Sequence, residues 1–112
     1  ILTIHKPDAM SMEKLFFTTN QKTAIDVAQA RGVILLCATQ HQIPCYHYTP
    51  LQVKQSVVGY GKAVKTQVME MTKRLLHLQA VPKPDDTADA LAIAICHAHS
   101  AGSRLAQYGA RY

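Results

Sequence analysis

The order of apolar and polar positions predicts a chain in which short strands alternate with helices. Residues 8–14 alternate weakly, with Ala9 and Met10 next to Met12, which is consistent with a mostly buried strand that has Glu13 near its end. Residues 20–41 carry apolar side chains at helical spacing behind Asn20, a favourable N-cap, and so predict a long helix. A strand over residues 33–38 is the alternative, but it would leave only four residues before the next apolar run.

This long helix has two neighbouring apolar stripes. Its second half is apolar nearly all round, so we expect it to pack against two surfaces at once. Small residues on the second stripe would permit close helix approach, and we expect that stripe to form a symmetric helix-to-helix contact in a dimer. The first stripe holds Ala24, Val27, Ile34 and Ala38, and the second holds Ile25, Ala28, Gly32 and Leu36.

The remaining segments predict one more strand and several helices. Residues 1–5 resemble the end of a helix, and residues 43–48 predict a strand rich in β-branched and aromatic side chains. Residues 50–57 predict a short helix with proline in its first turn, and residues 62–78 predict an amphipathic helix with lysines on its polar side. The final helix begins at residues 85–86 and is apolar on all sides, so we expect it to be central.

Composition is that of one globular domain. The chain has 112 residues, of which 48% are hydrophobic and 17% charged, and a chain of this length can bury an ordinary core without disulfides. Its three cysteines are odd in number and form no C-x-x-C pair, which favours a reducing compartment and predicts a cytoplasmic protein. The sequence has no apolar run of membrane-spanning length. It does not begin with Met, so we expect it to be a fragment of a longer protein.

The excess of positive charge lies in one stretch of the chain. The formal net charge is +5, and residues 51–84 alone contain six cations and one anion. This concentration favours a surface for a polyanion such as DNA, although a solvated basic face is the alternative. The six cations are Lys54, Lys62, Lys65, Lys73, Arg74 and Lys83.

Three carboxylates occupy places where carboxylates are costly. Glu13 ends an otherwise apolar strand, and Asp86 and Asp89 are three residues apart at the start of the predicted central helix. Mg²⁺ prefers such oxygen ligands, and a converging trio would support phosphodiester chemistry. The alternative is that the aspartates only cap the helix and that Glu13 is simply exposed.

Other residue types offer less chemistry. The six histidines show no metal-ligand spacing, and the cysteines are best explained by packing. Lys62 follows Gly59-x-Gly61, which is a weak signal for phosphate binding and equally typical of a turn. Phe16 and Phe17 adjoin the strand that carries Glu13, and one of them could stack on a base instead of packing in the core.

Four motifs closely resemble those of the bacterial RuvC crossover-junction endodeoxyribonucleases, the Holliday junction resolvases. The likeness covers the chain from its first residue to about residue 104, and it matches the carboxy-terminal portion of the family. The motifs are ARG at residues 30–32, VKQ-x-VVG-x-G at 53–61, K-x-QV at 65–68 and DALAIAI at 89–95.

The resemblance implies an α/β, RNase H-like fold and a homodimer. It also implies symmetric nicking of four-way junction DNA with two Mg²⁺ ions per active site, in partnership with RuvA and RuvB. The family's acidic positions match Glu13, Asp86 and Asp89, which would be catalytic and would hold the metal. Its DNA contacts match Phe16, Lys54 and Lys65, and Lys62 is a further DNA-binding candidate.

One departure from the family pattern changes the expected activity. The family begins with a strand bearing a G-I-D-P-G segment, whose aspartate is the central metal ligand, and this sequence contains no such segment. We therefore expect residues 1–112 to form a single partial RNase H-like domain. It would lack the first three strands and most of the first helix, expose a sheet edge and be unable to cut DNA as it stands.

Two other functions remain open at this point. The chain could be a dimeric nucleic-acid-binding module without catalysis, in which Asp86 and Asp89 only cap the helix. It could also be a scaffold for protein association, which the concentrated positive charge of residues 51–84 disfavours.

Overall fold

The structure, a computed structural model, describes the backbone of residues 1–14 and 21–108 and the side chains of residues 1–14 and 23–101. Helices and strands follow one another nearly as the sequence predicts. The elements in chain order are α1 (Leu2–His5), β1 (Met10–Glu13), α2 (Gln21–Gln40), β2 (Cys45–Tyr48), α3 (Pro50–Val57), α4 (Lys65–Leu75) and α5 (Asp85–Tyr108).

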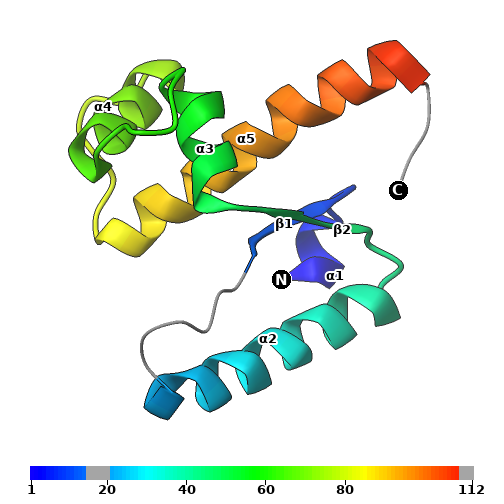
Figure 1. The fold of residues 1–112 in the computed structure, drawn as a ribbon. Helices are drawn as coiled ribbons and strands as arrows, with labels where there is room; N and C mark the ends of the chain where they lie inside the picture. The colour runs from blue at the N-terminus through cyan, green and yellow to red at the C-terminus, as the bar shows by residue number, and fades with distance from the viewer. Residues whose placement is uncertain (15–20, 109–112) are drawn as a thin grey trace.

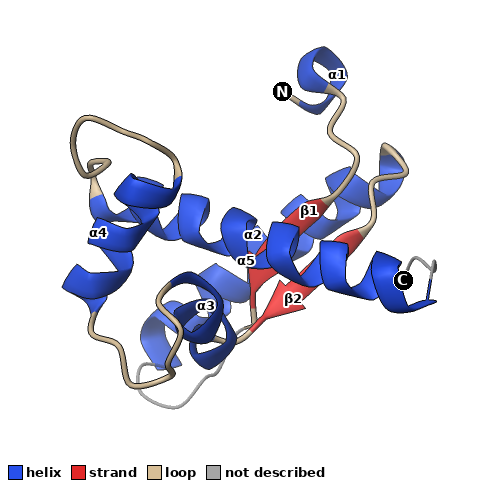
Figure 2. Ribbon diagram, turned by 90° about the horizontal axis from the view of Figure 1, so that it is seen from above, coloured by secondary structure: helices blue, strands red, loops and turns tan. Residues whose placement is uncertain are grey.

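The two strands form a small parallel sheet between layers of helices. Met10 pairs with Cys45 at one end of the sheet and Glu13 with Tyr48 at the other. α5 lies on one face of the sheet and α2 on the other, as Figures 1 and 2 show. Because neighbours in register share a face, Glu13 projects to the same side as Tyr48.

α5 is the central element, as the sequence predicts. It packs on α3, α4 and both strands, and its residues supply half of the main buried cluster. The cluster consists of Tyr48, Val53, Val57, Ala92, Ile95 and Cys96.

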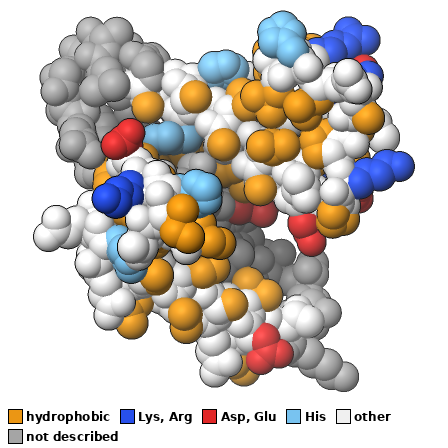
Figure 3. Space-filling view, turned by 180° about the vertical axis from the view of Figure 1, so that it is seen from behind, with side chains coloured by type: hydrophobic (Ala, Val, Ile, Leu, Met, Phe, Trp, Pro, Cys, Tyr) orange, Lys and Arg blue, Asp and Glu red, His pale blue; other side chains and the backbone are white. Residues whose placement is uncertain are grey.

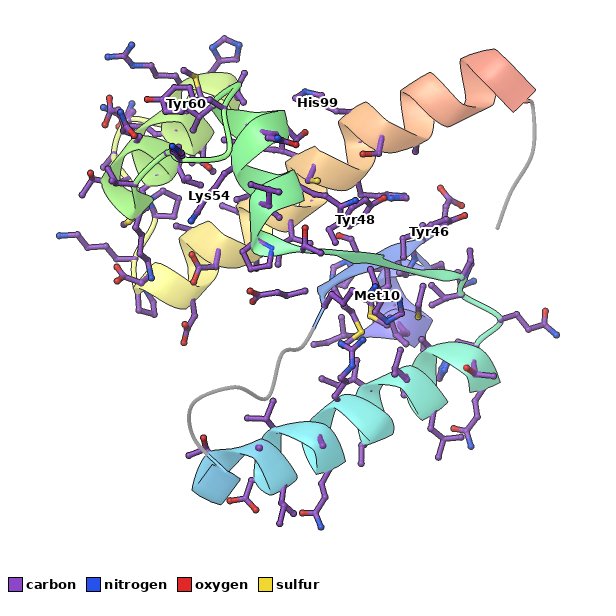
Figure 4. The ribbon with its side chains drawn as sticks, viewed as in Figure 1. Met10, Tyr46, Tyr48, Lys54, Tyr60 and His99 are labelled. Carbon is purple, nitrogen blue, oxygen red and sulfur yellow. The ribbon has the colours of Figure 1, made fainter. Side chains whose placement is uncertain are left out.

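Two histidines of α5 contact different elements, as expected from their spacing of two. His97 Nδ1 lies 2.6 Å from the hydroxyl of Tyr48, and the His97 ring stacks on Tyr46 with centroids 4.4 Å apart. Figure 4 shows both tyrosines close to α5. His99 Nδ1 instead lies 2.9 Å from the Ser56 hydroxyl on α3. These contacts join the middle of the chain to its last helix.

Polar side chains set the starts of α3 and α4. Thr49 and Gln52 form a reciprocal capping box around the start of α3, where Pro50 is the first residue. The predicted helix over residues 62–78 is shorter in the structure, since it covers Lys65–Leu75. Its start is fixed because the side chain of Gln67 accepts a hydrogen bond from the Val64 amide at 2.8 Å.

α2 is less buried than its apolar stripes predict. Ala38 is fully buried, but Val27 and Ile34 of the same stripe are exposed, as are Ile25 (66% exposed) and Val33 (68%). The reason is geometric: a helix of 20 residues is about 30 Å long, whereas strands of four residues span only about 13 Å. Most of the helix therefore extends beyond the described sheet.

Candidate active site

A cavity of about 570 Å³ brings together charged residues from four parts of the chain. Glu13 comes from β1, Lys54 from α3 and Asp89 from α5. Lys65 is the first residue of α4, and Lys62 lies in the turn before it. These are five of the seven residues that the sequence singled out for catalysis or DNA binding. The rest of the lining is apolar apart from backbone, and it consists of Pro50, Val53, Ala63, Val64, Val68, Ala92 and Ile93.

The local fold explains why these side chains meet. Glu13 is the last residue of β1, and α5 packs against the face of the sheet to which it projects. Only Thr49 separates the end of β2 from α3, so Lys54 is carried to the same end of the sheet as Glu13. In Figure 4, Lys54 extends from α3 on the side where α4 and the first turns of α5 lie.

At the α5 wall of the cavity, a lysine is shared between two aspartates. Lys65 Nζ lies 3.6 Å from Oδ2 of Asp85 and 3.6 Å from Oδ2 of Asp89. Asp86, which the sequence placed beside Asp89, is exposed and does not line the cavity. Its role as a metal ligand stays a prediction. Asp85 is not among the site residues predicted from the sequence, although its spacing of four places it on the same side of a helix as Asp89.

Arg31 is a second residue whose role the sequence analysis missed. It is half-buried on α2, and its Nη1 donates a hydrogen bond to the backbone carbonyl of Glu13 at 3.0 Å. This bond ties the end of β1 to the helix on the opposite face. The pKa of His47, on the neighbouring strand, is lowered mainly by partial burial and further by the positive charges of Arg31 and Lys14.

The charges of the cavity suit a divalent cation together with a phosphate. Glu13 and Asp89 supply two carboxylates, which is about the number that Mg²⁺ uses when water and a substrate phosphate complete its shell. Within the described ranges there is no group of three or more His, Cys, Asp or Glu side chains that could hold a metal. Lys54, Lys62 and Lys65 bring three positive charges to the same cavity, so an anion is favoured there.

The other predicted residues have simpler outcomes. Phe16 lies outside the described residues, so its contact with DNA stays a prediction. Cys96 packs in the core as expected, and burial raises the pKa of its thiol, which makes it a poor nucleophile. No helix among the described residues is both long and apolar enough to span a membrane.

Comparison with known proteins decides the family. The family model described as "Crossover junction endodeoxyribonuclease RuvC" matches residues 1–97. The chain belongs to the RuvC family. RuvC of Halothermothrix orenii is 61% identical over 100 residues, which cover 89% of this chain and 61% of the relative. RuvC of Caldicellulosiruptor saccharolyticus is 54% identical over 107 residues, which cover 96% of this chain and 64% of the relative.

Solved RuvC structures share the fold. The structure of Thermus thermophilus RuvC matches with a TM-score of 0.85 at 39% identity, covering 91% of this chain and 61% of that one. T. thermophilus RuvC in complex with a Holliday junction substrate matches with a TM-score of 0.81 at 35% identity. The expected α/β, RNase H-like fold is therefore confirmed, and the chain spans about 60% of the length of the RuvC proteins it matches.

Replacing Arg31 by Met removes the donor to the Glu13 carbonyl and keeps a long side chain. The neighbouring amide of Lys14, which donates to the Tyr48 carbonyl at 2.8 Å, should then exchange with deuterium about fivefold faster. Hydrogen exchange followed by NMR measures this rate. Arg74→Met, on the surface of α4, is the matched control and should leave Lys14 unchanged. Equal Lys14 protection in both variants would contradict the role of Arg31.

Proposed function

We propose that this chain supplies active-site and DNA-binding residues of a Holliday junction resolvase. The reaction is hydrolysis of phosphodiester bonds in four-way junction DNA, symmetrically on the two sides of the junction, during recombination and repair. The observation that carries the proposal is the cavity that Glu13 and Asp89 line together with three lysines. The names of the RuvC relatives and the T. thermophilus complex with junction DNA point in the same direction.

Each wall of the cavity has its own task in this reaction. Glu13 and Asp89 would hold Mg²⁺, with Asp86 as a flanking ligand, and two bound ions would supply an activated water and charge stabilisation for the leaving oxygen. Lys54, Lys62 and Lys65 bind the phosphate and neutralise the negative charge that grows on it during hydrolysis.

Junction binding draws on a wider surface than the cavity. The net positive charge of residues 51–84 supplies phosphate contacts without sequence preference, and Phe16 would stack on a base at the junction. Binding and cutting then depend on different residues, because carboxylates hold the metal while lysines hold the phosphates.

The proposed assembly is a homodimer that works with RuvA and RuvB. The exposed apolar face of α2, which includes Ile25 and Leu36, supports a helix-to-helix contact between two copies. Figure 3 shows hydrophobic side chains at the surface in the lower part of the view, where α2 lies. A cytoplasmic location stays part of this proposal.

The second candidate function is a nucleic-acid-binding module without catalysis. The ion pairs of Lys65 favour it, because they give Asp85 and Asp89 a structural role that needs no metal. Under that function, divalent cations would not bind at Glu13, and junction DNA would be bound but not cut.

Removing the carboxylates should separate cutting from binding. In a chain of the relatives' full length, Glu13→Gln, Asp86→Asn and Asp89→Asn should each slow junction cleavage by about 100-fold or more, because each removes charge that holds the metal. Junction affinity in Ca²⁺ should stay nearly unchanged, since the phosphate contacts remain. Cleavage and gel-shift assays on the same four-way junction measure the two effects.

A matched control for this experiment is Glu70→Gln. Glu70 lies on α4, outside the cavity lining, where it pairs with Lys73 and Arg74. Cleavage by this variant should match that of the unchanged protein. Wild-type cleavage rates in the Glu13 and Asp89 variants would show that these carboxylates are structural.

Salt dependence should show which lysines contact phosphate. Lys54→Ala and Lys65→Ala should each make the plot of log affinity against log salt concentration shallower by about 1. Each should also slow cleavage. Lys73→Ala makes the same charge change at a lysine that pairs with Glu70 outside the cavity, so its effect should be smaller. Gel shifts across a series of salt concentrations measure the slopes, and equal slopes for all three variants would contradict phosphate binding in the cavity.

A further inference from the structure

The ion pairs of Lys65 join a carboxylate inside the cavity to one outside it. Lys65 and Asp89 line the cavity, whereas Asp85 does not. The ammonium nevertheless lies at the same distance, 3.6 Å, from an oxygen of each aspartate. Asp85 and Asp89 are one helical turn apart, so α5 itself holds the two carboxylates on one side.

This arrangement makes Lys65 a competitor for any cation that enters the cavity. A divalent cation has twice the charge of an ammonium and coordinates a carboxylate oxygen directly, so it can displace Lys65 from Asp89. Asp85 lies outside the lining, so a cation held in the cavity leaves its carboxylate to Lys65. The exchange can be fast, because exposed side chains change rotamer rapidly, and those of Lys65, Asp85 and Asp89 are 55%, 63% and 49% exposed.

We propose that Asp85 is a positioning residue for Lys65. When a divalent cation takes the carboxylate of Asp89, Asp85 keeps the ammonium at the edge of the cavity, where it can bind the DNA phosphate. When no cation is bound, the two aspartates share the ammonium, and Asp85 weakens the hold of Lys65 on Asp89. The inference rests on the proposed function, since it uses the same cation site at Glu13 and Asp89.

Cation affinity of the chain itself tests the first half of this proposal. Mn²⁺ takes the same oxygen ligands as Mg²⁺, and electron paramagnetic resonance counts the free ion. Lys65→Gln should tighten Mn²⁺ binding about threefold, because it frees Asp89. Asp85→Asn should weaken binding about threefold, because Lys65 then pairs with Asp89 alone. Asp85→Glu, which keeps the carboxylate, should restore the affinity of the unchanged chain.

A double-mutant cycle separates positioning from a general loss of negative charge. If Asp85 acts through Lys65, Asp85→Asn should have little effect on Mn²⁺ affinity once Lys65 is Gln. Additive effects of the two substitutions would overturn the inference and leave the proposed function standing, provided that Glu13→Gln still abolishes Mn²⁺ binding. If the unchanged chain shows no Mn²⁺ binding that depends on Glu13, both the inference and the proposed function are contradicted. Circular dichroism of each variant checks that the fold is retained.

Cleavage kinetics test the second half. In a chain of the relatives' full length at saturating Mg²⁺, Asp85→Asn should lower kcat about threefold and leave KM unchanged, since Lys65 is then held by neither aspartate. Asp85→Glu should recover kcat. An unchanged kcat in Asp85→Asn would overturn the positioning role.

Discussion

Close packing of α5 against the sheet and α3 is the constraint on which the site depends. Ala88, Ala92 and Cys96 are spaced by four residues and are all buried, so one side of α5 is lined by small side chains. Small side chains let a helix approach its neighbours closely. Asp89 follows the first of these alanines, next to the buried stripe, and it lines the same cavity as Glu13, the last residue of β1.

Positive and negative side chains at the cavity are nearly equal in number. Two carboxylates and three lysines line the cavity, and Asp85 adds a third carboxylate just outside it. Such a set favours a ligand that brings both signs of charge, as a metal-bound phosphate does. Arg31 reaches the same strand end from the opposite face of the sheet and holds the backbone of Glu13, so the site is supported from both layers.

Much of the fold could be predicted from local sequence signals. The turn of β2 into α3 follows from Thr49-Pro50, and the central place of α5 follows from its apolar run. The exposure of α2 could not be predicted, because it depends on how much sheet lies beneath the helix and not on the pattern of the helix itself. The pattern does predict the apolar face, but the described chain leaves most of it uncovered.

The residues around the candidate site were harder to predict than those that line it. The strand end and the basic stretch identify Glu13 and the lysines, and the start of the last helix identifies Asp89. Spacing alone could not show that Asp85 pairs with Lys65, since residues three and four apart both lie near one helix face. The pairing is a tertiary contact between the start of α4 and the start of α5.

The most direct test of this account locates a divalent cation on the chain. Mn²⁺ titrated into the ¹⁵N-labelled chain broadens NMR signals of nearby amides, and the account predicts the earliest broadening at Glu13, Lys14 and Asp89. Glu13→Gln should abolish it. Broadening centred instead on Asp26 or Glu70, with Glu13 and Asp89 unaffected, would contradict the claim that the cavity is the metal site.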